Sequence, residues 1–320
     1  MMVMTQQIAQ QNEKRRINEL LAQDELSNSQ SDRLYRQALT MIRDNLQDFY
    51  MQYADNSGLS LVQTRHAVTG WDMQQWRKAV NSVDMANWDD EAKYQAGKYS
   101  YQAGHDRTNM IDAIIGLAVV NMTANMRQLI NDRLTADQAS QINHLEDSLE
   151  QYLDRKVKTP LIYELPSKST AKSIITQQET RNLWSDQLWL NSQEMANDVQ
   201  TLVNKHLRHG MDLKDMQDML TEHVNPKQFR PGKSLADRMK QVDYSTQRLV
   251  RTESARLIDE ANMTTYSMNG VSMVQWVTEP GACEKCQAIA DQGPYTLASA
   301  PSIPNDTHPN CRCSKIPFVY

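Results

Sequence analysis

Cysteine is missing from residues 1–282 of this 320-residue chain, and all four cysteines lie in its last 38 residues. This distribution excludes a disulfide framework spread over the fold and favours a reducing compartment, in which thiolates bind metal. Glycine and proline are also scarce, at ten each, and aromatic residues make up only 7% of the chain. Gln, Asn, Met, Ala and Leu are abundant instead, a balance that favours helix over sheet. The sequence therefore predicts a mainly α-helical protein.

Long hydrophobic runs and a dominant charge are absent as well. The longest apolar run, residues 113–120, is far shorter than the ~20 residues that a membrane-spanning helix needs. The first 16 residues are rich in Gln and in charge, without the apolar segment of a secretion signal. The net charge of −5 is divided almost evenly between the two halves, so no general field attracts the chain to nucleic acid or to an anionic membrane. We expect a soluble, intracellular protein with no membrane partner, and we identify no internal repeat.

The N-terminal half has the periodicity of amphipathic helices. A first helix is predicted around residues 17–21, where a few apolar residues stand in a largely polar segment. A second is predicted over residues 34–53, where apolar positions recur at intervals of three and four. Two further helix starts have the residues of a capping box, namely Ser60 with Gln63 and Thr135 with Gln138. The apolar run 113–120 should lie at the middle of a helical bundle. We assign residues 1–165 to an N-terminal helical domain.

The C-terminal half, residues 166–320, reads as a second domain. Helices are predicted over residues 170–192, 194–208 and 212–222, and Ser234 with Asp237 begins a long helix that ends near Met268. After Gly270 the pattern changes. The segment 271–277 is rich in strand-forming residues, and 316–320 is a candidate returning strand. The fold prediction is thus helical, with a C-terminal α+β module, about 271–320, that contains a small zinc-stapled β-hairpin.

The four cysteines and one histidine form two short chelating motifs. Cys283 and Cys286 are separated by two residues, which lets both sulfurs reach one ion, and His308 and Cys311 have the same separation. We favour these four as the ligands of a structural Zn²⁺, with Cys313 as the alternative to His308. Free thiols and disulfides are the competing interpretations. The neighbouring bases Lys285, Arg312 and Lys315 should offset the charge of the thiolates.

Sequence motifs of catalysis are absent from the chain. It has no G-x-S-x-G elbow, no H-E-x-x-H and no glycine-rich phosphate loop, so we predict no enzyme and no small-molecule substrate. Residues 227–256 carry eight basic against three acidic residues. This stretch could contact DNA phosphates or an acidic partner, or it could be a solvated helix face. Its candidate contact residues are Lys240, Arg248, Arg251 and Arg256. The segment 251–253, Arg-Thr-Glu, could also form an ion-pair network that ties its helix to the metal module.

The C-terminal residues together resemble the Mu F-like head-morphogenesis proteins, which are minor capsid components of tailed bacteriophages. The resemblance covers residues 180–320 best and depends on an ordered set of short motifs: Trp184 to Trp189, Arg251-Thr252-Glu253, Gly270, Trp276, Cys283-x-x-Cys286, Gly293 with Tyr295, His308-Pro309-Asn310-Cys311-Arg312-Cys313, and Pro317. Residues 49–54 are similar, with lower specificity, to minor capsid proteins of phages that infect Gram-positive hosts.

The resemblance implies a low-copy virion protein. Such a protein is made in the host cytoplasm, enters the procapsid near the portal inside the capsid, and acts in head assembly and in DNA packaging or ejection. Its expected partners are the portal protein, a scaffold or the major capsid protein, and phage DNA. The alternative that we keep open is a zinc-dependent nucleic-acid-binding protein that acts outside the virion.

Overall fold

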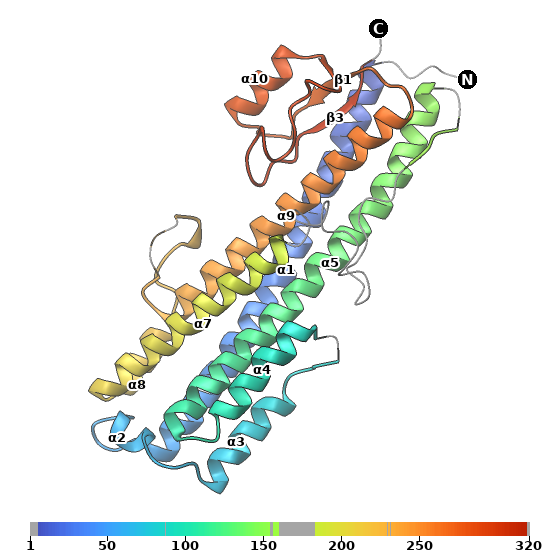
Figure 1. Ribbon diagram of the computed structural model, residues 1–320. Helices are drawn as coiled ribbons and strands as arrows, with labels where there is room; N and C mark the ends of the chain where they lie inside the picture. Colours follow the sequence, from blue (N-terminus) through green and yellow to red (C-terminus); the bar gives the residue numbers. More distant parts are fainter. Residues whose placement is uncertain are drawn as a thin grey trace. The chain divides into compact units, whose positions relative to one another are not determined.

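The computed structural model describes residues 6–86, 88–153, 156–159, 183–228, 230 and 232–318. Helices make up 71% of the structure, and the described residues also form a small three-stranded antiparallel sheet (Figure 1). The prediction of a mainly helical fold is therefore confirmed. In chain order the elements are α1 (Gln6–Tyr53), α2 (Leu61–Thr64), α3 (Gly70–Asn81), α4 (Asp90–Gln102), α5 (Arg107–Leu153), α7 (Leu183–His209), α8 (Leu213–Met219), the 3₁₀ turn η1 (Pro226–Gln228), α9 (Leu235–Met268), β1 (Met273–Val277), α10 (Glu284–Gln292), β2 (Tyr295–Thr296) and β3 (Ser314–Pro317).

The chain forms two compact units, each built from separate segments. The first unit comprises residues 1–29, 130–180 and 247–320, and the second comprises residues 30–129 and 181–246. Helices α1, α5 and α9 contribute residues to both. The boundary that the sequence places at residues 165 and 166 lies outside the described residues, and each compact unit combines segments from both sides of it.

Two long helices replace the shorter ones expected from periodicity. Helix α1 is continuous where the sequence predicts two helices. The prediction failed because the middle of its buried face is polar: Asp24, Ser27 and Ser31 are at most 6% exposed. An apolar pattern cannot register such a stretch. Helix α7 likewise continues through residue 193, where a break was predicted, and the predicted residues 170–182 lie outside the described chain.

Helix α5 supplies the centre of the helical core. Residues 113–120 are all buried, as the sequence predicts. One 18-residue window of α5 is long and apolar enough to cross a membrane by composition alone, yet 72% of that window is buried inside the protein, as in the central helix of a bundle. In the second unit α4 lies against this helix, with the ring of Tyr99 over Gly116, where a Cβ atom would fall 2.2 Å from the ring.

Helix starts follow the capping signals with one exception. Ser60 and Gln63 form the predicted capping box of α2. At α9 the amide of Asp237 donates to Ser234 Oγ at 3.0 Å and the amide of Ser234 donates to Asp237 Oδ2 at 3.1 Å, so this predicted start is confirmed. The predicted start at Thr135 is wrong. Thr135 lies inside α5, and its hydroxyl donates to the carbonyl of Asn131 four residues earlier. Threonine forms this bond inside helices and also occurs at N-caps, so the residue type alone does not distinguish the two positions.

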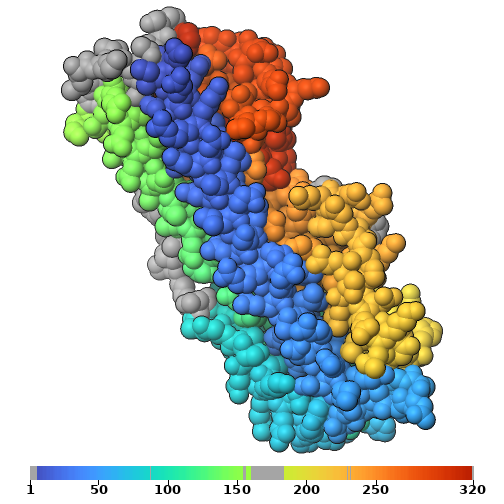
Figure 2. All heavy atoms as spheres, turned by 180° about the vertical axis from the view of Figure 1, so that it is seen from behind, coloured from blue at the N-terminus to red at the C-terminus, as the bar shows by residue number. Residues whose placement is uncertain are grey.

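The sheet belongs to the first unit and has the order β2-β1-β3. The predicted strand at 271–277 is present as β1, and the returning strand forms as β3, two residues earlier than predicted. Strand β2 was not predicted. Ile17 of α1 packs against Val277 and Ile316 of the sheet, which places the module beside the N-terminal part of α1 (Figures 1 and 2).

Candidate metal centre

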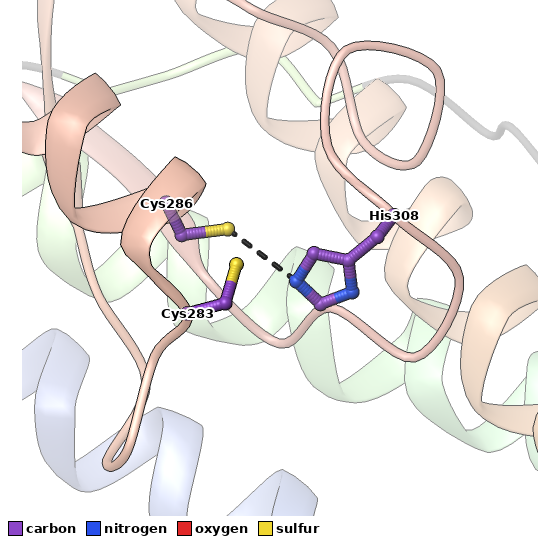
Figure 3. A group of neighbouring side chains, drawn as sticks. All are labelled: Cys283, Cys286 and His308. Carbon is purple, nitrogen blue, oxygen red and sulfur yellow. Dashed lines mark hydrogen bonds between the residues drawn. The ribbon is translucent and has the colours of Figure 1, made fainter.

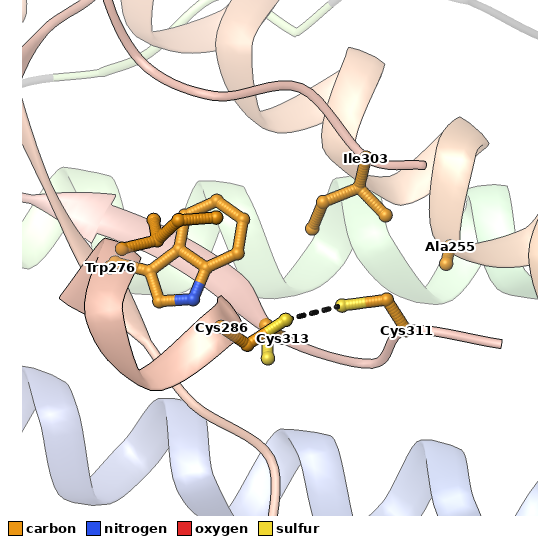
Figure 4. Close-up of a cluster of buried hydrophobic side chains, with 7 residues drawn as sticks. Ala255, Trp276, Cys286, Ile303, Cys311 and Cys313 are labelled. Carbon is orange, nitrogen blue, oxygen red and sulfur yellow. Dashed lines mark hydrogen bonds between the residues drawn. The ribbon is translucent and has the colours of Figure 1, made fainter. Parts of the chain in front are cut away.

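The five candidate ligands come from two segments on either side of the loop that leads to β3. Cys283 is the N-cap of α10 and Cys286 lies in its first turn, a helix that the sequence analysis does not predict. His308, Cys311 and Cys313 precede β3. The structure brings all five donors into one cluster, in two overlapping groups that share Cys286 (Figures 3 and 4).

The distances between donor atoms fit one small ion. Cys286 Sγ lies 3.5 Å from His308 Nε2 and 3.7 Å from Cys311 Sγ. Zinc bonds of about 2.3 Å to sulfur and about 2.0–2.1 Å to nitrogen give tetrahedral edges of roughly 3.5 Å for S···N and roughly 3.8 Å for S···S. Both observed separations are therefore those of two ligands on the same tetrahedral ion.

The two groups leave the choice of the fourth ligand open. In the first, the donor atoms of Cys283, Cys286 and His308 all lie within 4.8 Å of one another. In the second, the same holds for Cys286, Cys311 and Cys313. The predicted set takes the whole first group and adds Cys311, and the predicted alternative uses Cys313. The cluster could hold a metal ion with either set.

The surroundings of the donors shift their pKa values in both directions. The amide of Cys286 donates to the Cys283 sulfur and lowers the pKa of that thiol, as expected for a zinc knuckle. The pKa of Cys311 is lowered to about 6, mainly by a hydrogen bond from the Cys313 side chain. The pKa of Cys286 is raised to about 12, mainly by burial. His308 Nδ1 lies 2.8 Å from the carbonyl of Pro309. Since a carbonyl can only accept, Nδ1 carries the proton and Nε2 keeps its lone pair for a metal.

Arg312, between two of the cysteines, connects the cluster to the helices of the first unit. Its side chain is buried and donates from Nε to Asp24 of α1 at 2.8 Å and from Nη1 to Ser254 of α9 at 2.8 Å. Its backbone amide donates to Glu279 at 2.9 Å. The expectation that Arg312 offsets thiolate charge is therefore wrong, because its charge faces Asp24.

The other two bases near the cysteines also have different partners. Lys315 is 1% exposed and its Nζ lies 2.8 Å from Asp259 Oδ1. Lys285 Nζ donates to the carbonyl of Thr307 at 3.0 Å. The charge of Lys315 is therefore balanced by Asp259 and not by the thiolates. A carbonyl carries no net charge, so the role expected of Lys285 stays a prediction.

Two further arginines share the carboxylates that Arg312 contacts. Arg133 of α5 donates to Asp24 at 3.1 Å and to Asp137 at 2.8 Å, and Arg251 of α9 donates to Glu279 at 2.6 Å. Three guanidinium groups therefore face three carboxylates in a charge-balanced network. A buried network of this kind is costly to break at one member, because the opposite charge is left unpaired.

The Arg-Thr-Glu segment joins its helix to the metal module, as the sequence predicts. Arg251 forms its ion pair with Glu279, and Thr252 Oγ1 accepts a hydrogen bond from the amide of Asn310 at 3.1 Å. Asn310 has φ = 70°, a left-handed conformation that Asn adopts more readily than most residues. This contact fixes the turn between His308 and Cys311.

The four candidate cations for DNA or partner contact have partners within the chain. Lys240 forms ion pairs with Asp32 and Asp243. Arg256 pairs with Glu253 at 2.8 Å and with Glu260 at 3.3 Å. Arg251 pairs as described, and Arg248 also has an interaction partner. All four candidate contact residues therefore already interact within the chain.

Spacing alone identified the five donors, whereas the carboxylates of the network had no signal in the sequence. Asp24 and Arg312 are 288 residues apart and belong to no common motif. No family model, curated protein or solved structure matches the chain.

Proposed function

We propose that this chain is a phage head-morphogenesis protein, a non-enzymatic minor capsid component whose C-terminal module is held together by a structural Zn²⁺. The observation that carries the proposal is the three-dimensional contact among the motifs of the resemblance. The Arg-Thr-Glu segment contacts Glu279 and Asn310, and the arginine of the last motif reaches α1 and α9. Three motifs that are separated along the chain, Arg-Thr-Glu, the first cysteine pair and the His308–Cys313 segment, are thus in direct contact.

A structural role for the ion fits the donors and their burial. Cys286, Cys311 and Cys313 are each at most 5% exposed. A closed set of four Cys and His ligands leaves no position for a catalytic water. A structural zinc contributes on the order of 10 kcal/mol to the folding of such a small module.

In the proposed role the protein acts by binding. It would be made in the host cytoplasm, enter the procapsid beside the portal, and contact the portal, a scaffold or the major capsid protein, with phage DNA as a further contact. The alternative, a zinc-dependent nucleic-acid-binding protein outside the virion, has less support, because three of its candidate contact residues, Lys240, Arg251 and Arg256, already form ion pairs within the chain.

The particle experiment tests the capsid role directly. Procapsids from infected cells should contain the chain in few copies, and it should co-purify with the portal protein. The Cys286→Ser chain should enter fewer particles, while the exposed-surface variant His209→Asn should enter as the wild type does. Absence of the wild-type chain from purified procapsids would contradict the proposal.

Elemental analysis tests the zinc separately. The purified chain should contain about one zinc per molecule, and Cys286→Ser should lose it because Cys286 belongs to both donor groups. A metal-free chain with a cooperatively unfolding C-terminal module would contradict the structural zinc and leave the particle result to be judged by itself.

A further inference from the structure

A groove in the second unit runs between α1, the end of α3 and the middle of α5, and we call it the α1–α3 groove. Its volume is about 670 Å³, and every residue that lines it belongs to the second unit. Helix α1 lines it from Arg33 to Asn45, which at 1.5 Å per residue is roughly 18 Å of helix. The groove is therefore long as well as large, and it contains none of the candidate metal ligands.

The α1 side of the groove has the spacing of a helix-packing seam. Its members follow one another at intervals of four, three and four, the a and d positions of a heptad: Leu34, Ala38, Met41 and Asn45. In coiled coils and helical bundles such a seam packs against a neighbouring helix, whereas this seam lines the groove. The α1–α3 groove thus lies where a further helix would pack.

Asn45 has an unused hydrogen-bonding atom at this seam. The residue is 7% exposed, and its Nδ2 donates to the carbonyl of Met41 at 2.8 Å. Its Oδ1 is buried and has no hydrogen-bond partner among the described residues. A buried acceptor without a donor is costly. Coiled coils keep an asparagine at an a position in spite of its cost in stability, because it fixes the register of the paired helices.

The lining does not suit a nucleic acid. It has no aromatic side chain on which a base could stack, and two acidic residues accompany its three basic ones. Arg36 pairs with Asp32 at 2.7 Å and Lys78 pairs with Asp48 at 2.8 Å. Arg33, the third base, is exposed and has no side-chain partner in the part of the chain that the structure describes. One free cation can pair with one acidic side chain but not with a row of phosphates.

The shape of the groove fits a helix better than an extended peptide. Its walls are helices and the turn after α3, so they offer no strand edge to which an extended chain could add. The seam from Leu34 to Asn45 is ~16.5 Å long. Half of a cylinder of that length, ~10 Å wide like a helix, occupies roughly 650 Å³. A short helix sunk to half its width would therefore fill the groove.

We propose that the α1–α3 groove is the docking site for one amphipathic helix of a partner protein. Apolar side chains of that helix pack on the seam, as in other cases where a helix binds a groove through anchors three and four residues apart. A side-chain N–H of the partner donates to Oδ1 of Asn45, and an acidic residue pairs with Arg33. The inference rests on the proposed function, in which the chain acts by binding, but not on the metal centre.

Photo-cross-linking from the groove tests this occupant. A benzophenone amino acid is placed in the full chain at Gln37 or at Asp44, two exposed lining positions seven residues apart, in infected cells. A docked helix has the same rise as α1, so the two adducts should map about seven residues apart in one partner segment, whereas an extended chain would give about three. The yield should be at least tenfold above that from Gln47, which is exposed on the same helix outside the groove.

Substitutions separate docking from folding. Thr40 is an exposed lining residue, so Thr40→Trp should fill the groove and lower the cross-linking yield at least fivefold. The matched variant Gln47→Trp should leave the yield within twofold. Asn45→Leu removes the buried acceptor that lacks a donor. It should raise the urea midpoint of the second unit in the free chain and lower the yield at least fivefold, whereas an asparagine with a purely structural role would lower the midpoint.

Several results would overturn the proposal. These are a yield from Gln37 no higher than from Gln47, adducts about three residues apart, adducts on nucleic acid or on a second copy of this chain, and an unchanged yield from Asn45→Leu. Adducts with the helical spacing on a protein that is absent from purified procapsids would support the docking site and contradict the capsid role. The failure of either proposal is therefore distinguishable from the failure of the other.

Discussion

The most informative single substitution is Asp24→Asn, which removes one charge from the buried network. Asp24 is 3% exposed and receives hydrogen bonds from Arg133 and Arg312, and Arg251 lies 3.6 Å away. With asparagine at this position, three guanidinium groups face two carboxylates. Loss of one partner from a buried ion pair costs about 3–5 kcal/mol, because the remaining charge is desolvated without compensation. We expect the free energy of unfolding of the first unit to fall by about this amount.

The assay should follow the first unit alone. Trp276 is the one tryptophan of its segments, and the other five belong to the second unit. Incorporation of 5-fluorotryptophan therefore gives a ¹⁹F resonance for Trp276 that reports urea unfolding of the first unit, assigned with Trp276→Phe. The control is Glu150→Gln in the same unit. Glu150 pairs with Lys156 at 3.1 Å, but the lysine is 94% exposed, so the loss should be below about 1 kcal/mol.

A second variant separates charge imbalance from local distortion. Asp24→Asn combined with Arg312→Met restores equal numbers of guanidinium and carboxylate groups, and replacement of a whole buried pair is often nearly neutral. The double variant should therefore be at least 1 kcal/mol more stable than Asp24→Asn. The charge argument fails if Asp24→Asn costs no more than the exposed control, or if the second substitution only adds to the loss.

Three further outcomes follow from the structure. Cys313→Ser should keep about one zinc per chain while His308→Asn should bind it at least tenfold more weakly, measured by competition with a chromogenic chelator; the opposite pattern would make Cys313 the fourth ligand. Burial raises the pKa of Asp112 from 3.8 to about 6, so the folded second unit binds more protons than the unfolded chain between these values and loses stability as pH rises through them. Asp112→Asn should remove this pH dependence and stabilise the unit at pH 7.5 by about 1–3 kcal/mol in urea titrations, and an unchanged profile would refute the assignment. Asp237→Ala should cost about 2–4 kcal/mol in the same titrations, because Asp237 accepts four backbone N–H groups, from residues 223, 224, 233 and 234; a loss below 1 kcal/mol would contradict this.

The sequence predicts those helix starts that depend on local chemistry. The capping residues of α2 and α9 act within three positions of the chain, so their effect is readable from the sequence. Whether a helix continues depends instead on what its buried face contacts elsewhere in the fold. In α1 the positions between the two apolar segments face buried polar partners, such as Asp24 with Arg133, which no periodicity of hydrophobic residues can reveal.

The same distinction applies to the candidate metal centre. The pairs Cys283 with Cys286 and His308 with Cys311 are local, and their spacing was sufficient to predict that the two segments meet. The carboxylates that anchor this centre are remote in sequence, and Asp24 meets Arg133 across 109 residues. The predicted role of Arg312 and Lys315 was wrong for this reason, since sequence proximity to thiolates says nothing about a competing carboxylate.

Helix α4 illustrates a third case, in which a sequence pattern is visible but its direction is not. Its aromatic residues include Tyr94, Tyr99 and Tyr101, and hydrophobic periodicity would place the regular pair, Tyr94 and Tyr101, against the core. The structure does the reverse, because Gly116 of α5 offers space to Tyr99 alone and turns the repeated tyrosines outward. An inward pair would be ordinary core packing, whereas the outward pair lies at the surface, with Lys98 over the Tyr94 ring and His105 beside the Tyr101 ring. The inward position of Tyr99 thus depends on a glycine in another helix, 17 positions away in the chain, which no periodicity within α4 can reveal.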